Sequence, residues 1–242
     1  MKRLTKLRFV LVYPMVVVLF LVARTTERQL HLGILFIALG MYVRFWANGY
    51  VGHRKVNQTA VSRGEPKIGT LITGGPYAYV RHPLYVGSFL LGLGFCVIVG
   101  HLLFGVVALG GLFVVYQRKM AQEEAVLLHE WGDKYLRYYR HVPRLIPTWR
   151  RAPERRGRWS WQGVAASQEL RTLVWVTVLV IALYFREELV QHREPLFYKH
   201  GLKQAVLLAV LAALMVGDGL FELVRRWRRR SVRLAASTPA AS

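Results

Sequence analysis

The sequence predicts an all-α, polytopic integral membrane protein: a helical bundle of about six transmembrane helices with both termini in the cytoplasm. Two observations lead to this fold class. First, 54% of the 242 residues are hydrophobic, yet 34 Lys and Arg stand against 13 Asp and Glu, a net charge of +21. Second, the cations are concentrated on one side of the apolar segments. A disordered polyelectrolyte or a soluble nucleic-acid-binding domain would be far less apolar, so both classes are disfavoured.

The apolar segments define the expected spans. The longest stretch without a charged side chain is 84–117, and as one helix it would be about 51 Å long. Because the hydrocarbon core is only about 30 Å thick, this stretch must fold back, most simply at Gly100-His101. The other spans are expected at 9–23, 30–46, 170–185 and 202–223, with flanking Lys and Arg snorkelling where a span is short.

The cations give the orientation. Of the 34 Lys and Arg, 28 lie in the N-terminal segment, in the loops after the second and fourth spans, and in the C-terminal tail, counting Arg44 and Arg171 at the span ends with these loops. The other six, with Lys203 at a span end, lie on the opposite side. Since cytoplasmic loops carry an excess of Lys and Arg, this split predicts cytoplasmic termini and a multi-pass protein of the cell inner membrane. The first apolar run is expected to be a retained helix, because no small-x-small cleavage site follows it.

Four regions are expected along the chain. Residues 1–148 form a membrane core of four spans and their cytoplasmic loops. Residues 149–169, rich in Arg and Trp, form an interfacial linker; a nucleic-acid patch could look similar, but spans on both sides favour the membrane surface. Residues 170–230 form a two-helix membrane hairpin, and 231–242 a disordered tail.

Polar chemistry concentrates in two cytoplasmic segments, of which the first is GGPYAYVRHPLYVG at 74–87. Pro83 can be the first residue of a helix. Arg81 and His82 would then lie at a helix N-terminus, where free backbone N–H groups can bind an anionic group. The alternative is an interfacial belt of Tyr and Arg, although such a belt does not need Gly, Pro and His at this density.

The second segment follows the fourth span and begins with the pair Glu123-Glu124. Lys119 and Glu123 are four residues apart on the expected helix, so the adjacent Glu124 faces different neighbours. A solvated face that balances Arg118 and Lys119 is the alternative interpretation. The segment continues with WGDKY at 131–135, YYR at 138–140 and VPRLIP at 142–147.

Together the two segments resemble the isoprenylcysteine carboxyl methyltransferase and phospholipid methyltransferase family of integral membrane enzymes. The resemblance covers about residues 40–150 and consists of GPYxYVRHPxYxG at 75–87, then the Glu pair, W-G-x-x-Y-x-x-Y and V-P-R-x-x-P at 123–147. It implies S-adenosylmethionine (SAM) as the methyl donor, bound from the cytosolic side. It also implies a lipophilic acceptor that comes from the bilayer.

The resemblance further implies the site residues. Catalytic roles would belong to Glu124, Lys119 and Arg144. Many relatives carry Arg where this chain has Lys119, and its role in anchoring the acceptor stays open because Arg and Lys hold carboxylates differently. Near the cofactor would lie Tyr77, Arg81, His82, Pro83, Tyr85, Gly87, Glu123, Glu124, Tyr135 and Tyr139, joined by Gly92 and Gly94 unless these serve only helix packing.

Methyl transfer from a sulfonium needs alignment, exclusion of water and local charge balance. We expect one Glu of the pair to hold the positive portion of the cofactor and backbone N–H groups near His82-Pro83 to receive its carboxylate. His82 could hydrogen-bond the cofactor or act as a base. A base is needed for an amine or thiol acceptor but not for a carboxylate.

The acceptor is left open between an isoprenylcysteine-type carboxylate or similar lipophile, a phospholipid amine and a thiol. An NADPH-dependent membrane reductase with a similar RHPxY element is a second possibility, against which the Glu pair counts; a non-catalytic membrane scaffold is a third. No nucleic-acid partner is expected, and no metal site, because the His residues lack ligand spacing and Cys96 is single. Asp218 in the last span is interpreted as structural.

Overall fold

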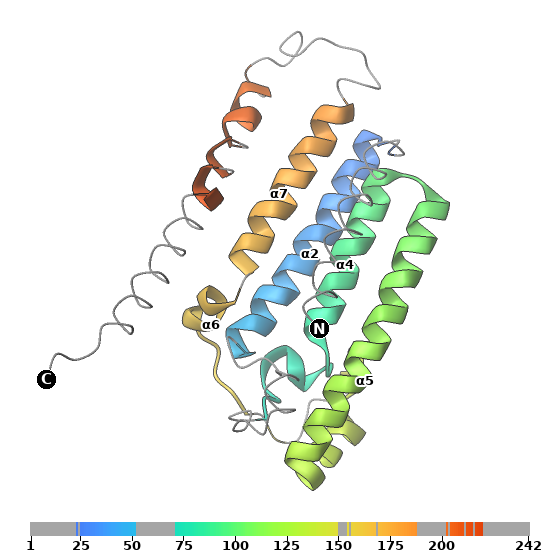
Figure 1. Cartoon of the computed structure of the whole chain (residues 1–242), viewed down its shortest axis with the longest axis vertical. Coiled ribbons are helices and arrows are strands. Elements are labelled where there is room, and N and C mark those ends of the chain that lie inside the picture. Colours follow the sequence, from blue (N-terminus) through green and yellow to red (C-terminus); the bar gives the residue numbers. More distant parts are fainter. Residues whose placement is uncertain are drawn as a thin grey trace, which may run out of the picture. The chain divides into compact units, whose positions relative to one another are not determined.

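The computed structural model describes residues 23, 25–51, 71–149, 154, 156–167 and 169–187, and in the last part 202, 204–210, 212–214 and 216–219. The secondary structure in these ranges is helical (Figure 1). Apart from Ala23, the expected first span at 9–23 lies outside the described residues, as does the tail at 231–242. The elements are α2 (Glu27–Val51), the 3-10 helix η1 (Gly75–Ala78), α4 (Pro83–Val99), α5 (Leu102–His141), α6 (Trp161–Ala166) and α7 (Glu169–Arg186).

The chain divides into two compact units, Met1–Leu170 and Arg171–Ser242. In the second unit the Arg171 guanidinium meets the Asp218 carboxylate twice, with Nε–Oδ1 and Nη2–Oδ2 distances of 3.1 Å. A carboxylate within an apolar helix is expected to be paired in this way. The contact agrees with the structural interpretation of Asp218.

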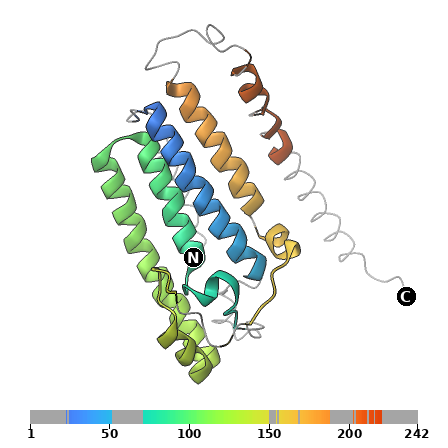
Figure 2. The same cartoon turned by 180° about the vertical axis from the view of Figure 1, so that it is seen from behind.

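In the first unit, α2 and α4 lie side by side in both views (Figures 1 and 2) and touch through two pairs of glycines. A Cβ atom at Gly94 would lie 2.7 Å from the carbonyl oxygen of Gly33, and one at Gly40 would lie 2.7 Å from that of Gly87. The partners are seven residues apart in each helix and run in opposite directions. Small residues allow this close approach of helix backbones, so Gly87 and Gly94 serve helix packing.

The stretch 84–117 folds back as predicted. Gly100 ends α4 in the left-handed conformation, with φ 66° and ψ 17°, and its N–H bonds to the carbonyls of Cys96 and Val97. His101 then caps α5, because its Nδ1 accepts the N–H of Phe104 at 3.3 Å. The turn at Gly100-His101 is therefore confirmed, and it makes α4 and α5 a helical hairpin.

Two described helices, α2 and α5, are long and apolar enough to cross a bilayer, and α4 is a shorter apolar helix of 17 residues. Their apolar side chains face outward: Leu35 of α2 is 54% exposed and Val107 of α5 is 66% exposed. An apolar outer surface suits lipid better than water. The total of six spans and the orientation of the termini stay predictions.

Helix α5 has 40 residues and would be about 60 Å long, roughly twice the hydrocarbon thickness. Only its charge-free first part, up to Gln117, has the composition of a membrane span, and charged side chains follow from Arg118 onward. Gly132 interrupts this charged part with φ 47° and ψ −124°. A Cβ there would meet nothing within 4 Å, so it is the backbone conformation that favours glycine at this position.

Beyond Gly132, the end of α5 forms a small core with the segment around η1. Tyr135, Tyr138 and Val142 are buried against Leu71 and Ala78. The Tyr138 hydroxyl also donates a hydrogen bond of 2.7 Å to the carbonyl of Tyr77. The two sequence motifs are thereby held together at one end of the helical hairpin.

Candidate active site

The segment after α5 runs alongside the turn before α4. The backbone N–H of Arg81 donates to the carbonyl of Pro143 at 2.8 Å and that of His82 to Arg144 at 3.2 Å, while Thr148 donates to Tyr79 at 3.0 Å. Three backbone bonds thus join motifs about sixty positions apart. These bonds also occupy the backbone N–H groups of Arg81 and His82. The sequence analysis had expected N–H groups near His82-Pro83 to bind the carboxylate of the cofactor.

Glu124 lies buried between three basic side chains. His82 Nε2 lies 3.0 Å from its Oε1 and Arg81 Nη1 lies 3.2 Å from the same oxygen, while Arg144 donates from Nε at 3.1 Å and from Nη2. Burial would raise the pKa of this carboxyl, but the bonds from His82 and Arg144 and the charge of Arg81 lower its pKa to about 2. The same contact raises the pKa of Arg144. Glu124 therefore carries a full negative charge that organises its neighbours.

Glu123 faces another set of partners, as the helical spacing predicted. It accepts a hydrogen bond of 2.7 Å from the Tyr85 hydroxyl, and its Oε2 lies 3.6 Å from His82 Nδ1. His82 consequently meets a carboxylate on each ring nitrogen. The Tyr85 ring packs on Tyr116 of α5, with ring centroids 4.7 Å apart.

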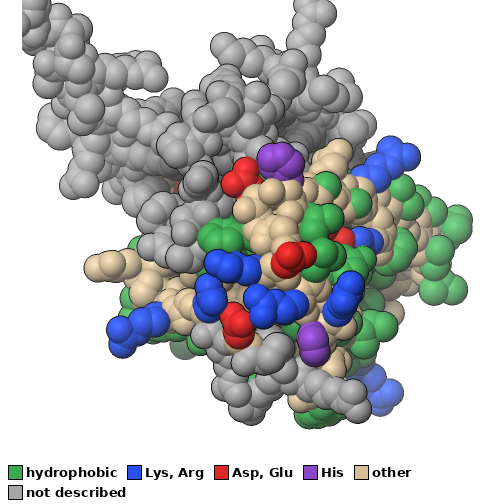
Figure 3. All heavy atoms as spheres, turned by 90° about the horizontal axis from the view of Figure 1, so that it is seen from below, with side chains coloured by type: hydrophobic (Ala, Val, Ile, Leu, Met, Phe, Trp, Pro, Cys, Tyr) green, Lys and Arg blue, Asp and Glu red, His purple; other side chains and the backbone are tan. Residues whose placement is uncertain are grey.

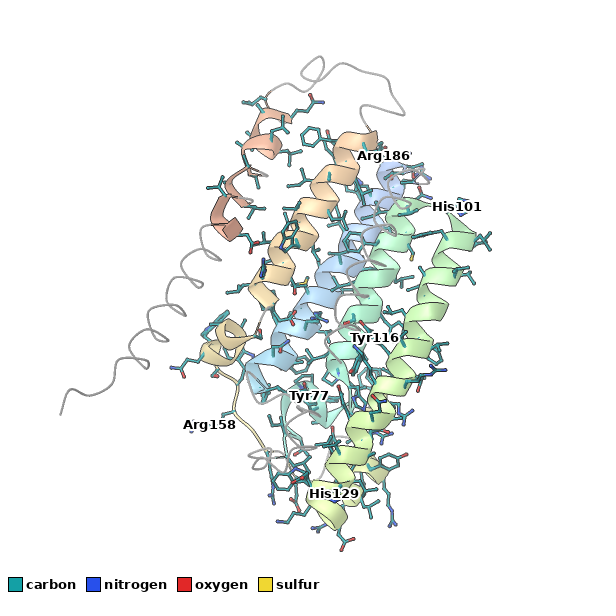
Figure 4. All side chains as sticks on the ribbon, viewed as in Figure 1. Tyr77, His101, Tyr116, His129, Arg158 and Arg186 are labelled. Atoms are coloured by element: carbon teal, nitrogen blue, oxygen red, sulfur yellow. The ribbon has the colours of Figure 1, made fainter. Side chains whose placement is uncertain are left out.

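A cavity of about 380 Å³ opens at this end of the hairpin, within the range of small-molecule sites. Two of its lining residues, Tyr77 in η1 and Tyr116 on α5, are labelled in Figure 4. Eight residues that the sequence assigned to the site line it: Tyr77, Arg81, His82, Pro83, Tyr85, Lys119, Glu123 and Tyr135.

Four residues assigned from the sequence do not line the cavity. Glu124 and Arg144 lie behind it and bind Arg81 and His82 as described above. Tyr139 stacks under Arg81, whose Cζ lies 3.8 Å above the ring centroid. Gly87 faces α2 instead.

Sequence reasoning also missed lining residues, of which Arg44, Ser88, Tyr116 and Tyr138 carry polar groups. Helical spacing could have found two of them, because Ser88 follows Tyr85 by three positions and Tyr116 precedes Lys119 by three. Arg44 had been counted only as a topology signal. No local pattern connects it with the motifs, because it lies about thirty residues before them in the chain.

Arg81 has unused hydrogen-bonding capacity in the cavity wall. Its side chain is 9% exposed and its Nη1 atom lies in the ion pair with Glu124, whereas its Nε atom has no hydrogen-bond partner among the residues that the structure describes. A buried guanidinium with an unpaired N–H donor is suited to a carboxylate. In the same part of the chain, no group of three His, Cys, Asp or Glu could hold a metal ion.

Comparison with known proteins agrees with the resemblance seen in the motifs. Residues 28–134 match the model of the phospholipid methyltransferase family. The chain is 37% identical over 116 residues to the protein-S-isoprenylcysteine O-methyltransferase of Schizosaccharomyces pombe, covering 46% of this chain and 47% of the relative. It is 30% identical over 119 residues to the Homo sapiens enzyme of the same name, covering 48% and 40%.

A methanethiol S-methyltransferase of Crocosphaera subtropica is 40% identical over 72 residues, covering 29% of this chain and 27% of the relative. The chain thus spans less than half the length of each of these relatives. No solved structure matches it. Over residues 28–134, the family resemblance inferred from the motifs is confirmed.

Proposed function

We propose that this chain is a multi-pass membrane methyltransferase that transfers the methyl group of SAM to a lipophilic acceptor from the bilayer. The observation that carries the proposal is the cavity where the RHP turn and the Glu pair meet, at the polar end of apolar helices. The similarity of residues 28–134 to a methyltransferase family supports the same reaction.

The cavity wall offers a matching group for each charged part of the donor. SAM carries a carboxylate, an ammonium and a sulfonium whose methyl is activated for displacement. The Nε donor of Arg81 suits the carboxylate, and Glu123 suits a positive group. The half-buried ring of Tyr77 and the buried ring of Tyr135 add aromatic surface, which attracts cations.

Glu124 and Arg144 act as positioning residues in this proposal. Neither lines the cavity, but Glu124 holds Arg81 and His82 from behind, and Arg144 neutralises Glu124. Lys119 lines the cavity and has no ion-pair partner among the described residues. We assign it to the acceptor, because a free ammonium there can attract an anionic group.

The environment of His82 favours a carboxylate acceptor of the isoprenylcysteine type. Each of its ring nitrogens faces a carboxylate, which fixes the ring but leaves it poorly placed to take a proton from an acceptor. A carboxylate needs no base. Thiol S-methylation and N-methylation of a phospholipid amine are the alternatives, and the thiol alternative draws support from the methanethiol S-methyltransferase relatives.

The location proposed is the cell inner membrane with the site on the cytoplasmic side. The distribution of Lys and Arg supports this location, because these side chains gather on the end of the molecule where α5 terminates, seen from below in Figure 3. Exposed Lys134, Arg137 and Arg140 belong to that part of α5. Such an excess marks cytoplasmic surfaces.

Ligand binding tests the proposal directly. Detergent-purified protein should bind SAM saturably and NADPH not at all, and membrane extracts supplied with labelled SAM should yield a labelled lipophilic product. A base-labile methyl ester in that product would identify a carboxylate acceptor, and a stable methyl amine or thioether would identify the alternatives. Saturable NADPH binding without SAM binding would instead indicate a reductase, and binding of neither would indicate a scaffold.

A further inference from the structure

A buried ion pair joins α2 to the first residue of α7. Arg44 donates from Nε to Glu169 Oε2 at 2.8 Å and from Nη2 to Oε1 at 2.7 Å. The side chain of Glu169 is 2% exposed. The remaining nitrogen of Arg44, Nη1, donates to Ser88 Oγ at 2.5 Å and to the carbonyl of Leu84 at 3.5 Å. The guanidinium is therefore held in a two-point contact with a carboxylate, the geometry of strong Arg–carboxylate pairs.

The local fold brings Glu169 to this position. Helix α6 packs on the end of α2, where the Ser160 N–H donates to the carbonyl of Gly49 at 2.9 Å. A Cβ at Gly163 would lie 2.8 Å from that same oxygen, so the two backbones are in direct contact. The Ser167 hydroxyl then accepts the Glu169 N–H at 3.3 Å. This contact aligns the start of α7 with Arg44.

The pair bears on the charge of the cavity, because Arg44 lines it. Two arginines line the cavity among the described residues, and each has a buried carboxylate beside it: Glu169 for Arg44 and Glu124 for Arg81. Glu124 also pairs with Arg144 behind the wall, and Lys119 and Glu123 line the cavity as well. Together these groups are four cations (Arg44, Arg81, Arg144 and Lys119) and three carboxylates (Glu169, Glu124 and Glu123), an excess of one positive charge that the loss of Glu169 would increase.

The negative charge of Glu169 acts electrostatically on a group that lines the cavity. Burial raises the pKa of the Tyr77 hydroxyl, and the negative charges of Glu123 and Glu169 raise it further. Removing the charge of Glu169 alone would leave the Arg44 cation in the wall uncompensated. In a site partly shielded from water, such a charge repels a cationic ligand over several ångströms.

We propose that Glu169 is a positioning residue that neutralises Arg44, so that the cavity accepts a ligand with a net positive charge. The inference rests on the proposed use of SAM, whose two cationic groups and one carboxylate leave a net charge of +1. Its product S-adenosylhomocysteine has an uncharged sulfur and no net charge. The site would then depend on a residue beyond 28–134, the part that matches the family.

The test compares the affinities of Glu169→Gln for the two ligands, since Gln keeps the shape of Glu without its charge. We expect the affinity for SAM to fall on the order of tenfold and that for S-adenosylhomocysteine by less than about twofold, both measured by calorimetry on detergent-purified protein. Glu154→Gln is the matched control: Glu154 also pairs with an arginine, Arg156, but does not line the cavity, and its side chain is 56% exposed. This control should bind both ligands as the wild type does.

A double variant keeps the proposal testable if the single variant fails to fold with an unpaired buried charge. Arg44→Gln combined with Glu169→Gln removes both charges and should restore SAM affinity to within about threefold of wild type. If Glu169→Gln lowers the affinity for SAM and for S-adenosylhomocysteine equally, Glu169 contributes shape alone and the inference is overturned. A double variant that still binds SAM tenfold more weakly than the wild type would also overturn it. If the wild type binds neither ligand, the proposed function itself fails.

Discussion

At the scale of single residues, the two adjacent glutamates have different roles that the sequence does not separate. Glu123 lines the cavity, where Tyr85 holds it, and Glu124 lies behind the wall between His82 and two arginines. Loss of a buried charge that balances others costs more than loss of its own contacts, because the partners are left uncompensated. Glu124 is thus the more sensitive position, even though it does not line the cavity.

Replacing Glu124 with Gln should reduce SAM-dependent methylation by at least about 100-fold, because displaced Arg81 and His82 no longer align the donor. Membrane insertion should be unchanged, since the apolar helices are untouched. The measurement is the initial rate with labelled SAM, normalised to the amount of protein in the membrane. Glu130→Gln, on the same helix and not lining the cavity, should keep wild-type rates. Wild-type rates in the Glu124 variant would refute its assignment.

At the scale of elements, the sequence predicts what local chemistry determines. The length of 84–117 against the bilayer thickness gives the hairpin and its turn at Gly100-His101, and the apolar run at 170–185 corresponds to α7, Glu169–Arg186. Helix α2 is longer than the predicted 30–46, because Thr26 caps its start through Gln29 and α6 supports its end.

Contacts between distant segments were not predictable in the same way. The pairing of Arg44 with Glu169 spans 125 positions, and no period in the sequence links them. The sequence indicates only one side of the glycine contacts between α2 and α4. Gly87 and Gly94 belong to a motif and were predicted to lie near the cofactor, whereas their partners Gly33 and Gly40 belong to no motif. Only the packed structure shows that the glycines are required for helix approach.

The glycine contact predicts a matched pair of variants. Gly94→Val should destabilise the protein by about 2 kcal/mol or more, because its side chain would meet the backbone of Gly33 at a distance that no Cβ can adopt. Gly110→Val in α5 changes the same residue type where a Cβ meets nothing within 4 Å, so it should cost less than about 0.5 kcal/mol. Thermal unfolding in detergent measures both. Equal destabilisation would mean that the glycine contact does not hold α2 against α4.

At the scale of the whole molecule, the distribution of cations and apolar side chains predicts how the protein lies in the membrane. The few acidic residues mark the proposed active site. Exposed apolar side chains cover the first part of α5, and exposed cations follow on the part beyond Gln117. The cavity lies where these two surfaces meet, with Lys119 and Glu123 in its wall. A donor from the cytoplasm and an acceptor from the bilayer could both reach such a site.

This placement predicts the accessibility of the two ends of α5, which Figure 4 shows with His101 at one end and His129 near the other. Cys96 is the single cysteine of the chain, so a Cys96→Ala background leaves no other thiol. Leu102 is 84% exposed and the side chain of His129 is 82% exposed. In intact cells an impermeant maleimide should label Leu102→Cys but reach His129→Cys only after the membrane is permeabilised. The reverse pattern would invert the topology, and labelling of both in intact cells would mean that α5 does not cross the membrane.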